Sequence, residues 1–192
     1  MVVDNTMNSL KRQHRRAGFT LAELMMVIAI IGIMSMIAIT MGLRYYPDYQ
    51  ARGAARNLVA NLQLARIEAI RSSANVVVEM TPGVLTVTGR VGGYRAFVDD
   101  GAGGGVSANN IRDGAERIIY TEIMPDRVSL IGLAGFTAAA DPLAAAGTRF
   151  TRYNARGILP SVADAGTITL GNGTRTYTAA LSTAGYIRLG VF

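Results

Sequence analysis

Few residues of this chain carry groups that could perform chemistry. The 192 residues include a single histidine, His14, and no cysteine. A nucleophile–histidine pair would have to use His14, and a metal site of histidine and cysteine would lack a second ligand. His14 lies in a short basic segment, and carboxylates such as Glu79 and Asp164 have no visible partner in the sequence. The sequence therefore predicts no catalytic residue and no cofactor.

The segment at residues 99–116 holds the next candidates. Residues 101–106 do not complete the dinucleotide-binding fingerprint, because Val106 occupies the position of its last glycine. Hard oxygen ligands, which calcium requires, are frequent here: Asp99, Asp100, Asn109, Asn110, Asp113 and Glu116. Their spacing matches no EF-hand, and such residues are also common in turns. A plain loop is the favoured interpretation, calcium stays an alternative, and no metal ligand is assigned.

The strongest pattern is a junction of basic and apolar segments at Gly18. Residues 11–16 are rich in Lys and Arg, and residues 24–43 carry no charge. The apolar run is long enough to cross a bilayer as one helix. A secretory signal has a shorter apolar core followed by small residues at its cleavage site, whereas Gly18 precedes the core. The arrangement predicts a cut that removes the basic residues and keeps the membrane helix.

Glu23 is a carboxylate at the start of this apolar segment. A charge within a membrane span costs about 2.5–3.5 kcal/mol on insertion scales, so it requires a partner. A cut after Gly18 would give Phe19 a free amine, which is protonated at neutral pH. The amine of a neighbouring subunit could then neutralise Glu23 between packed helices. The alternative is a plain signal anchor in which Glu23 is incidental.

Residues 18–24, Gly-Phe-Thr-Leu-Ala-Glu-Leu, followed by a full membrane span, resemble the processing motif of type IV pilins and type II secretion pseudopilins. The resemblance implies that a prepilin peptidase cuts after Gly18 on the cytoplasmic side and methylates the amine of Phe19. It gives Glu23 a role in subunit assembly. The implied partners are other pilin or pseudopilin subunits, the peptidase and an inner-membrane assembly platform.

The basic residues before the span also predict the topology. They place the amino terminus in the cytoplasm and the rest of this single-pass inner-membrane protein in the periplasm, before it enters a fibre. The chain divides into a leader at residues 1–18, a transmembrane and fibre-core helix at 19–46 and a globular domain at 47–192. Loss of the leader leaves 15 basic and 12 acidic residues, so the net charge falls from +6 to +3.

A second helical pattern begins after Pro47, which is expected to interrupt or bend the first helix. Residues 48–74 carry apolar side chains at spacings of three or four, which is typical of an amphipathic helix. The members of this stripe are Ala51, Ala55, Leu58, Leu62, Ala65 and Ala69. The stripe predicts a helix that packs on the remainder of the domain.

Short runs rich in Val, Ile, Thr and Tyr alternate with glycine turns after residue 75. They predict strands at 76–80, 84–91, 94–98, 118–122, 128–133, 149–153, 167–170, 174–181 and 186–191. Asn172-Gly173 is a strong hairpin signal. The predicted fold class is α+β, with a long N-terminal hydrophobic helix, transmembrane and then amphipathic, packed on an antiparallel β-sandwich-like domain at 76–192.

Residues 54–71, with the later segments 97–100, 150–157 and 181–188, resemble the GspH/FimT group of minor pilins and pseudopilins. The resemblance implies a structural, non-enzymatic subunit of a type II secretion pseudopilus or a type IV pilus. Such subunits are expected at or near the fibre tip, where they prime assembly for protein secretion or for pilus growth.

DNA binding for uptake is the alternative function. Some FimT-like minor pilins contact DNA through a Gly-Arg-x-Arg segment near the carboxyl end, and the corresponding residues here are 185–188, Gly-Tyr-Ile-Arg. The candidate DNA contacts are Arg175 and Arg188. Because phosphate contact depends on cationic groups, the tyrosine at the first arginine position weakens this interpretation. Nucleic acid is therefore a partner that the sequence does not favour.

Overall fold

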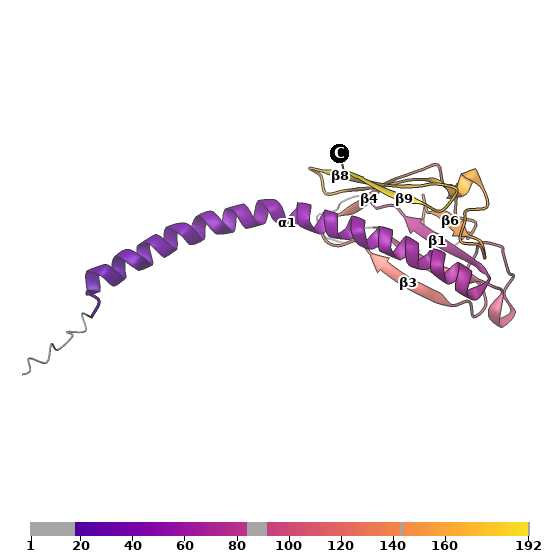
Figure 1. Cartoon of the computed structure of the whole chain (residues 1–192), viewed down its shortest axis with the longest axis horizontal. Coiled ribbons are helices and arrows are strands. Elements are labelled where there is room, and N and C mark those ends of the chain that lie inside the picture. The colour runs from indigo at the N-terminus through magenta and orange to yellow at the C-terminus, as the bar shows by residue number, and fades with distance from the viewer. Residues whose placement is uncertain (1–17, 84–91, 143, 192) are drawn as a thin grey trace, which may run out of the picture. The chain divides into compact units, whose positions relative to one another are not determined.

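The structure is a computed structural model that describes residues 18–83, 92–142 and 144–191. The strand predicted at 84–91 lies outside these residues. A helix, α1 (Leu21–Ser72), is followed by strands and two short 3-10 turns (Figure 1). The strands are β1 (Asn75–Thr81), β2 (Gly93–Asp99), β3 (Ile118–Ile123), β4 (Ser129–Ala134), β5 (Thr137–Ala138), β6 (Arg149–Tyr153), β7 (Gly166–Gly171), β8 (Thr176–Leu181) and β9 (Ile187–Val191), and the turns are η1 (Ala102–Gly104) and η2 (Val162–Asp164).

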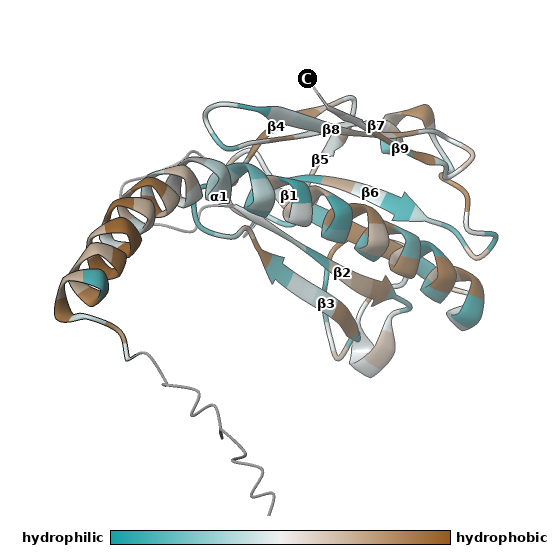
Figure 2. Ribbon diagram, turned by 60° about the vertical axis from the view of Figure 1, so that its left-hand side comes forward, coloured by the Kyte–Doolittle hydropathy of each residue, from teal (hydrophilic) through white to brown (hydrophobic). Residues whose placement is uncertain are grey.

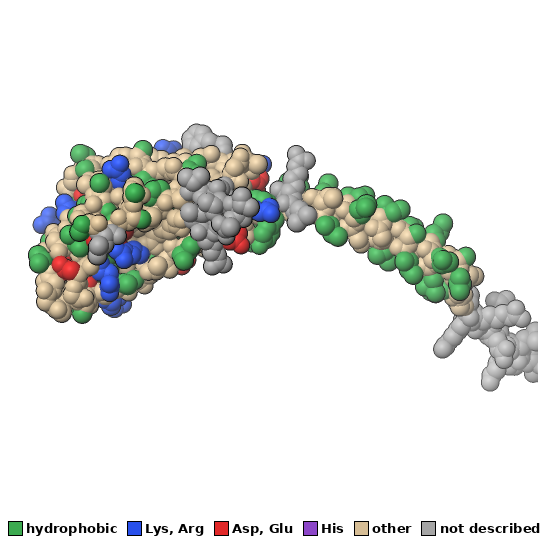
Figure 3. Space-filling view, turned by 180° about the vertical axis from the view of Figure 1, so that it is seen from behind, with side chains coloured by type: hydrophobic (Ala, Val, Ile, Leu, Met, Phe, Trp, Pro, Cys, Tyr) green, Lys and Arg blue, Asp and Glu red, His purple; other side chains and the backbone are tan. Residues whose placement is uncertain are grey.

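The two halves of α1 have different surroundings. All side chains at residues 21–42 are exposed although most are apolar, as Figure 3 shows for one face, and α1 is long and apolar enough to cross a membrane. The downstream half carries polar and apolar side chains on different faces (Figure 2). Its predicted stripe is buried, with Ala51, Leu58 and Ala69 fully inaccessible. The described residues divide into two compact units at the boundary between Gly42 and Leu43.

The sequence predicts that Pro47 interrupts or bends the helix, but α1 is not interrupted there. The helix continues through this proline to Ser72, although Pro47 has no N–H to donate to the preceding turn. The burial of Ala51, Ala54 and Ala55 directly after it holds the next turns in place. The helix ends two residues before the predicted end, because Ser73 adopts a positive φ of 52°, a left-handed conformation that closes helices.

The strands form two antiparallel sheets, which confirms the predicted α+β class. One sheet has the order β3-β2-β1-β6-β5 and the other has the order β4-β7-β8-β9. The described strands agree with the predicted ones within about two residues, except that β5 was not predicted. A strand of two residues has no alternating pattern that a sequence could reveal. The β7–β8 hairpin turns at the predicted Asn172-Gly173 pair, where Gly173 has a φ of 87°.

The main core lies between α1 and the inner faces of both sheets. It joins Leu58 and Leu62 of α1 to Val78 of β1 and Ile168 of β7, among other buried residues. A second cluster of Val77, Phe97 and Phe150 lies on the opposite face of the five-stranded sheet, because side chains alternate along a strand. β1 is therefore buried on both faces, which also encloses its polar residue Glu79.

We expect the chain from Pro47 onward to fold without lipid. The core draws on α1 after residue 50 and on both sheets, and it contains no residue of the apolar span. Circular dichroism of this fragment should show mixed helix and strand with one cooperative thermal transition. A reducing agent should leave the transition unchanged, because the sequence has no cysteine. A disordered spectrum would contradict the expectation.

Candidate assembly and binding sites

The predicted cleavage site lies in an accessible segment before α1. Gly18, Phe19 and Thr20 are exposed and precede the first helical residue, Leu21. A Cβ added at Gly18 would have no atom within 4 Å, and the Phe19 side chain is 77% exposed. Among the described residues, none packs on Gly18, and the peptide bond between Gly18 and Phe19 lies in an exposed segment that a peptidase could reach.

Thr20 caps the amino terminus of α1. Its hydroxyl oxygen accepts a hydrogen bond from the N–H of Glu23 at 3.2 Å, and its carbonyl accepts one from the N–H of Leu24 at 3.1 Å. Thr20 and Glu23 also have the spacing of a capping box. Sequence reasoning missed this motif, which was visible as Thr-x-x-Glu. A carboxylate in the first turn also stabilises the helix dipole, so Glu23 has a local role besides the predicted pairing.

Asp48, the residue after Pro47, binds the tip of the β7–β8 hairpin. Its Oδ1 accepts a hydrogen bond from Asn172 Nδ2 at 2.7 Å, and its Oδ2 lies 3.1 Å from Arg175 Nε. The Thr174 hydroxyl donates to Oδ1 at 3.3 Å. The hydrogen bond from Asn172 is the main cause that lowers the pKa of Asp48; burial opposes it, and the charge of Arg175 lowers the pKa further. These contacts tie the hairpin to α1 and give the candidate DNA contact Arg175 an anionic partner.

Replacing Asp48 by asparagine should lower the melting temperature of the full chain in detergent micelles at neutral pH. A lowered folded-state pKa means that the ionised carboxylate stabilises the fold above the unfolded pKa, and that this contribution is lost as the pH falls through the folded pKa. The wild-type and Asp48→Asn curves should therefore converge as the pH falls through the folded-state pKa of Asp48. Glu122→Gln, which removes a carboxylate from the exposed edge strand β3, is the control. A constant difference at all pH values would contradict the role of the charge.

The second candidate DNA contact, Arg188, lies at the other end of the β8–β9 pair. Arg188 is exposed and lies opposite Ala180 of β8. Ala180 is five residues after Arg175 in the sequence. Five residues of strand span roughly 17 Å, so the structure does not bring the two arginines together. Tyr186 is 73% exposed and lies under the Arg66 guanidinium, with 5.9 Å from Arg66 Cζ to the ring centroid.

The acidic loop between β2 and β3 is organised by its own hydrogen bonds. Glu116 accepts from the N–H groups of Gly101 and Asp113 at 3.0 and 3.2 Å, and burial raises its pKa. Asp113 accepts from the Val106 N–H at 3.0 Å, and Asp99 from the Asn110 N–H at 2.8 Å. Within the described part of the chain, no three acidic or histidine side chains are arranged to hold a metal ion. These carboxylates act as acceptors for backbone donors.

Two carboxylates without a visible partner in the sequence have partners in the fold. Glu79 accepts a hydrogen bond from Arg95 Nε at 2.5 Å, across the β1–β2 pair. Asp164 lies 3.3 Å from Arg152 Nε, and burial raises its pKa against the opposing charge of Arg152. The two residues of each ion pair are far apart in the sequence, so helix or strand periodicity could not predict these contacts.

Comparison with protein families gives two matches on different parts of the chain. Residues 54–185 match the family described as "Type II transport protein GspH". Residues 13–39 match the family described as "Prokaryotic N-terminal methylation motif". This matched segment contains Gly18, Phe19 and Glu23. The first match covers more than half of the chain and includes the downstream half of α1 and most of both sheets.

Two individual proteins are also similar. A pilin-like protein, PilA1, from Thermus thermophilus is 38% identical over 88 residues, which are 45% of this chain and 51% of that protein. The match thus spans about half the length of this relative. A crystal structure of the type IV minor pilin FimU from Pseudomonas aeruginosa aligns with a TM-score of 0.42 and 20% identity, covering 72% of this chain and 91% of that one.

Proposed function

Since this chain belongs to the GspH family of minor pilins and pseudopilins, we propose that it is a structural subunit that primes a type II secretion pseudopilus or a type IV pilus, or assembles at its tip. One observation carries the proposal. An N-terminal methylation motif and a membrane-length apolar helix precede the GspH region in the same chain. That combination joins a processing site, a membrane anchor and an exported domain.

The proposed maturation follows from the accessible N-terminal segment. A prepilin peptidase cuts between Gly18 and Phe19 and methylates the new amine, so the mature chain begins with α1 almost at once. The basic leader holds the amino terminus in the cytoplasm before the cut, and residues 47–192 lie in the periplasm. Each mature subunit then presents Glu23 and an amino terminus to neighbouring subunits and to an inner-membrane assembly platform.

Deleting the gene and measuring three activities would identify the machine. Protein secretion, twitching motility and DNA transformation should be compared in the deletion strain and in strains that express the wild-type chain or the Glu23→Ala variant. Loss of secretion alone supports a pseudopilus, and loss of twitching supports a type IV pilus. No loss in any of the three activities would contradict the proposal.

DNA binding by this chain should be weak at physiological salt. The Arg175 guanidinium is held by Asp48, and Arg188 lies at the far end of the same strand pair. We expect a Kd weaker than about 100 μM for duplex DNA, at the weak end of non-specific binding. The Tyr186→Arg variant should bind more tightly, because it adds an exposed cation two residues from Arg188.

The matched measurement compares Arg188→Ala with Arg175→Ala by fluorescence anisotropy over a range of salt. Any residual binding should fall more in Arg188→Ala, because this guanidinium is exposed while that of Arg175 is paired. A micromolar, salt-sensitive affinity that Arg188→Ala abolishes would place this protein among the DNA-uptake pilins instead.

A further inference from the structure

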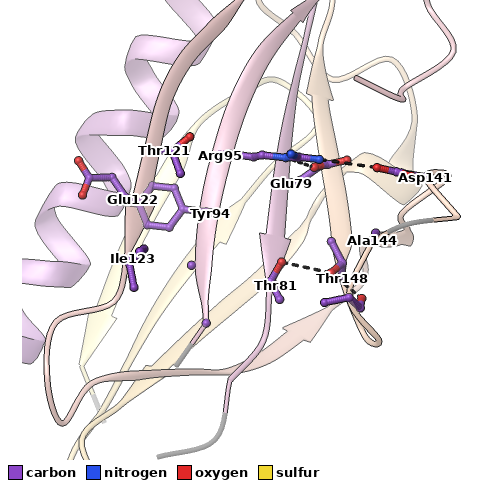
Figure 4. A pocket seen from close by; sticks show the side chains of 13 residues that line it. Glu79, Thr81, Tyr94, Arg95, Thr121, Glu122, Ile123, Asp141, Ala144 and Thr148 are labelled. Atoms are coloured by element: carbon purple, nitrogen blue, oxygen red, sulfur yellow. Dashed lines mark hydrogen bonds and ion pairs between the residues drawn. The ribbon is translucent and has the colours of Figure 1, made fainter. Parts of the chain in front are cut away.

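A groove of about 560 Å³ lies on the face of the five-stranded sheet that is turned away from α1. Glu79 and Thr81 of β1 and Arg95 of β2 line it, and the segment between β5 and β6 adds Asp141 and Thr148 (Figure 4). The neighbouring residues of β1, Val78 and Met80, belong to the core on the helix side. Because side chains alternate along a strand, Glu79 points into the groove.

The floor of this groove carries a row of charged side chains. Glu79, Arg95 and Asp141 form a row, with Arg95 Nε 2.5 Å from Glu79 Oε2 and Arg95 Nη2 3.7 Å from Asp141 Oδ2. Figure 4 shows these three side chains close together, joined by dashed lines. Within this row the Arg95 guanidinium contacts both carboxylates.

One oxygen of this row is buried without a partner among the described residues. Glu79 is 3% exposed, and its Oε1 has no hydrogen-bond partner there, while Oε2 is bound to Arg95. A buried carboxylate oxygen without a donor is unfavourable, since it has lost water and gained nothing in return. The nearby hydroxyls of Thr81 and Thr148 bond to each other at 3.2 Å, and Thr148 also donates to the carbonyl of Ala145.

We infer that this groove binds the basic side chain of an adjacent fibre subunit, a lysine ammonium or an arginine guanidinium. Oε1 of Glu79 is inaccessible in the structure, so such a group would donate to it once the Glu79 carboxylate turns toward the groove, and it would add a second cation to the row. Charge complementarity at a partly enclosed site gives specificity between partners. The choice of a fibre subunit as the partner rests on the proposed function, whereas the cation site itself does not.

The site is tested first with a small probe. N-acetyl-lysine methylamide is titrated into the isotope-labelled full chain in detergent micelles, and the backbone amide signals of Glu79 and Arg95 are followed. They should shift with saturation, and the affinity should fall at least about tenfold in Glu79→Gln, which keeps the side-chain volume and an acceptor for Arg95. Asp141→Asn, on the loop, should also weaken binding.

Two controls separate a cation site from general charge effects. Asp100→Asn removes an exposed carboxylate that is not among the residues lining the groove, and it should leave the affinity unchanged. N-acetyl-norleucine methylamide has a similar length without the charge and should cause no shift. Absence of shifts with the lysine probe, or equal shifts with the norleucine probe, would overturn the cation site.

The partner is tested by co-purification with the other pilin subunits of the host. Glu79→Gln should reduce the amount recovered, while its leader is still removed and Asp100→Asn behaves as the wild type. Unchanged recovery of Glu79→Gln would overturn the assignment to a fibre subunit even if the probe binds. If the wild type itself recovers no pilin subunit, the proposed function fails, and the probe result stands independently.

Discussion

The Glu23→Ala variant is expected to insert into the membrane and to be processed at Gly18, yet to be absent from the assembled fibre or tip complex. Removing the carboxylate makes insertion easier, because a charged side chain costs about 2.5–3.5 kcal/mol at the centre of a span and less near its edge, where Glu23 lies. It also removes the partner for the amine of a neighbouring Phe19, which would then be a lone charge among apolar side chains. Immunoblots of membrane and sheared-fibre fractions, with co-purification of other subunits, measure both effects.

Thr20→Ala is the matched control for Glu23→Ala. The hydroxyl of Thr20 caps the first turn of α1 by accepting from the Glu23 N–H, and its loss costs about 1 kcal/mol of helix stability. The variant keeps the carboxylate, so it should still assemble. If Thr20→Ala lost assembly to the same extent as Glu23→Ala, the role of Glu23 would be the local one, in starting the helix. Wild-type assembly of Glu23→Ala would contradict the pairing.

The Gly18→Val variant is expected to retain its leader and to accumulate in the membrane without entering a fibre. A side chain at this position meets no other atom within 4 Å, so the substitution leaves the fold intact and acts on recognition by the peptidase. Gly42→Ala, at a helical glycine that likewise has nothing within 4 Å, is the control and should be processed normally. Electrophoretic mobility distinguishes the two forms. Complete processing of Gly18→Val would contradict this assignment of the site.

Much of the fold was predictable because its signals are local. The buried stripe of α1 follows helical spacing, and the strands follow short β-branched runs bounded by glycine turns. The hairpin at Asn172 and Gly173 required a residue that tolerates a positive φ, and Gly173 provides it. In each case, a few neighbouring residues carried the information, so no knowledge of the tertiary arrangement was needed.

The polar contacts could not be predicted in this way. Asp48 meets Asn172 and Arg175 through the packing of the hairpin on α1, and no spacing in the sequence indicates that contact. The pairing of Glu79 with Arg95 depends on the register of β1 and β2. In the sequence alone, Arg175 is a free cation and Glu79 an unpartnered acid, and the fold assigns a partner to both.

The persistence of α1 through Pro47 also shows where a local rule yields to packing. Proline removes one backbone donor and disfavours the helix around it. Here the following turn buries Ala51, Ala54 and Ala55 against the sheets, and helices in proteins derive most of their stability from such packing. The expected interruption of α1 at Pro47 did not take into account the packing of these alanines, and it therefore overstated the effect of the proline.

The central claim is that this chain is a processed subunit that enters a fibre, and the mass of its mature form tests this most directly. The chain is recovered from purified fibres or from the subunit complex and analysed by intact-mass and N-terminal peptide mass spectrometry. We predict a chain that begins at Phe19 and carries one methyl group on its amino nitrogen. An assembled chain that still contains residues 1–18 would contradict the claim.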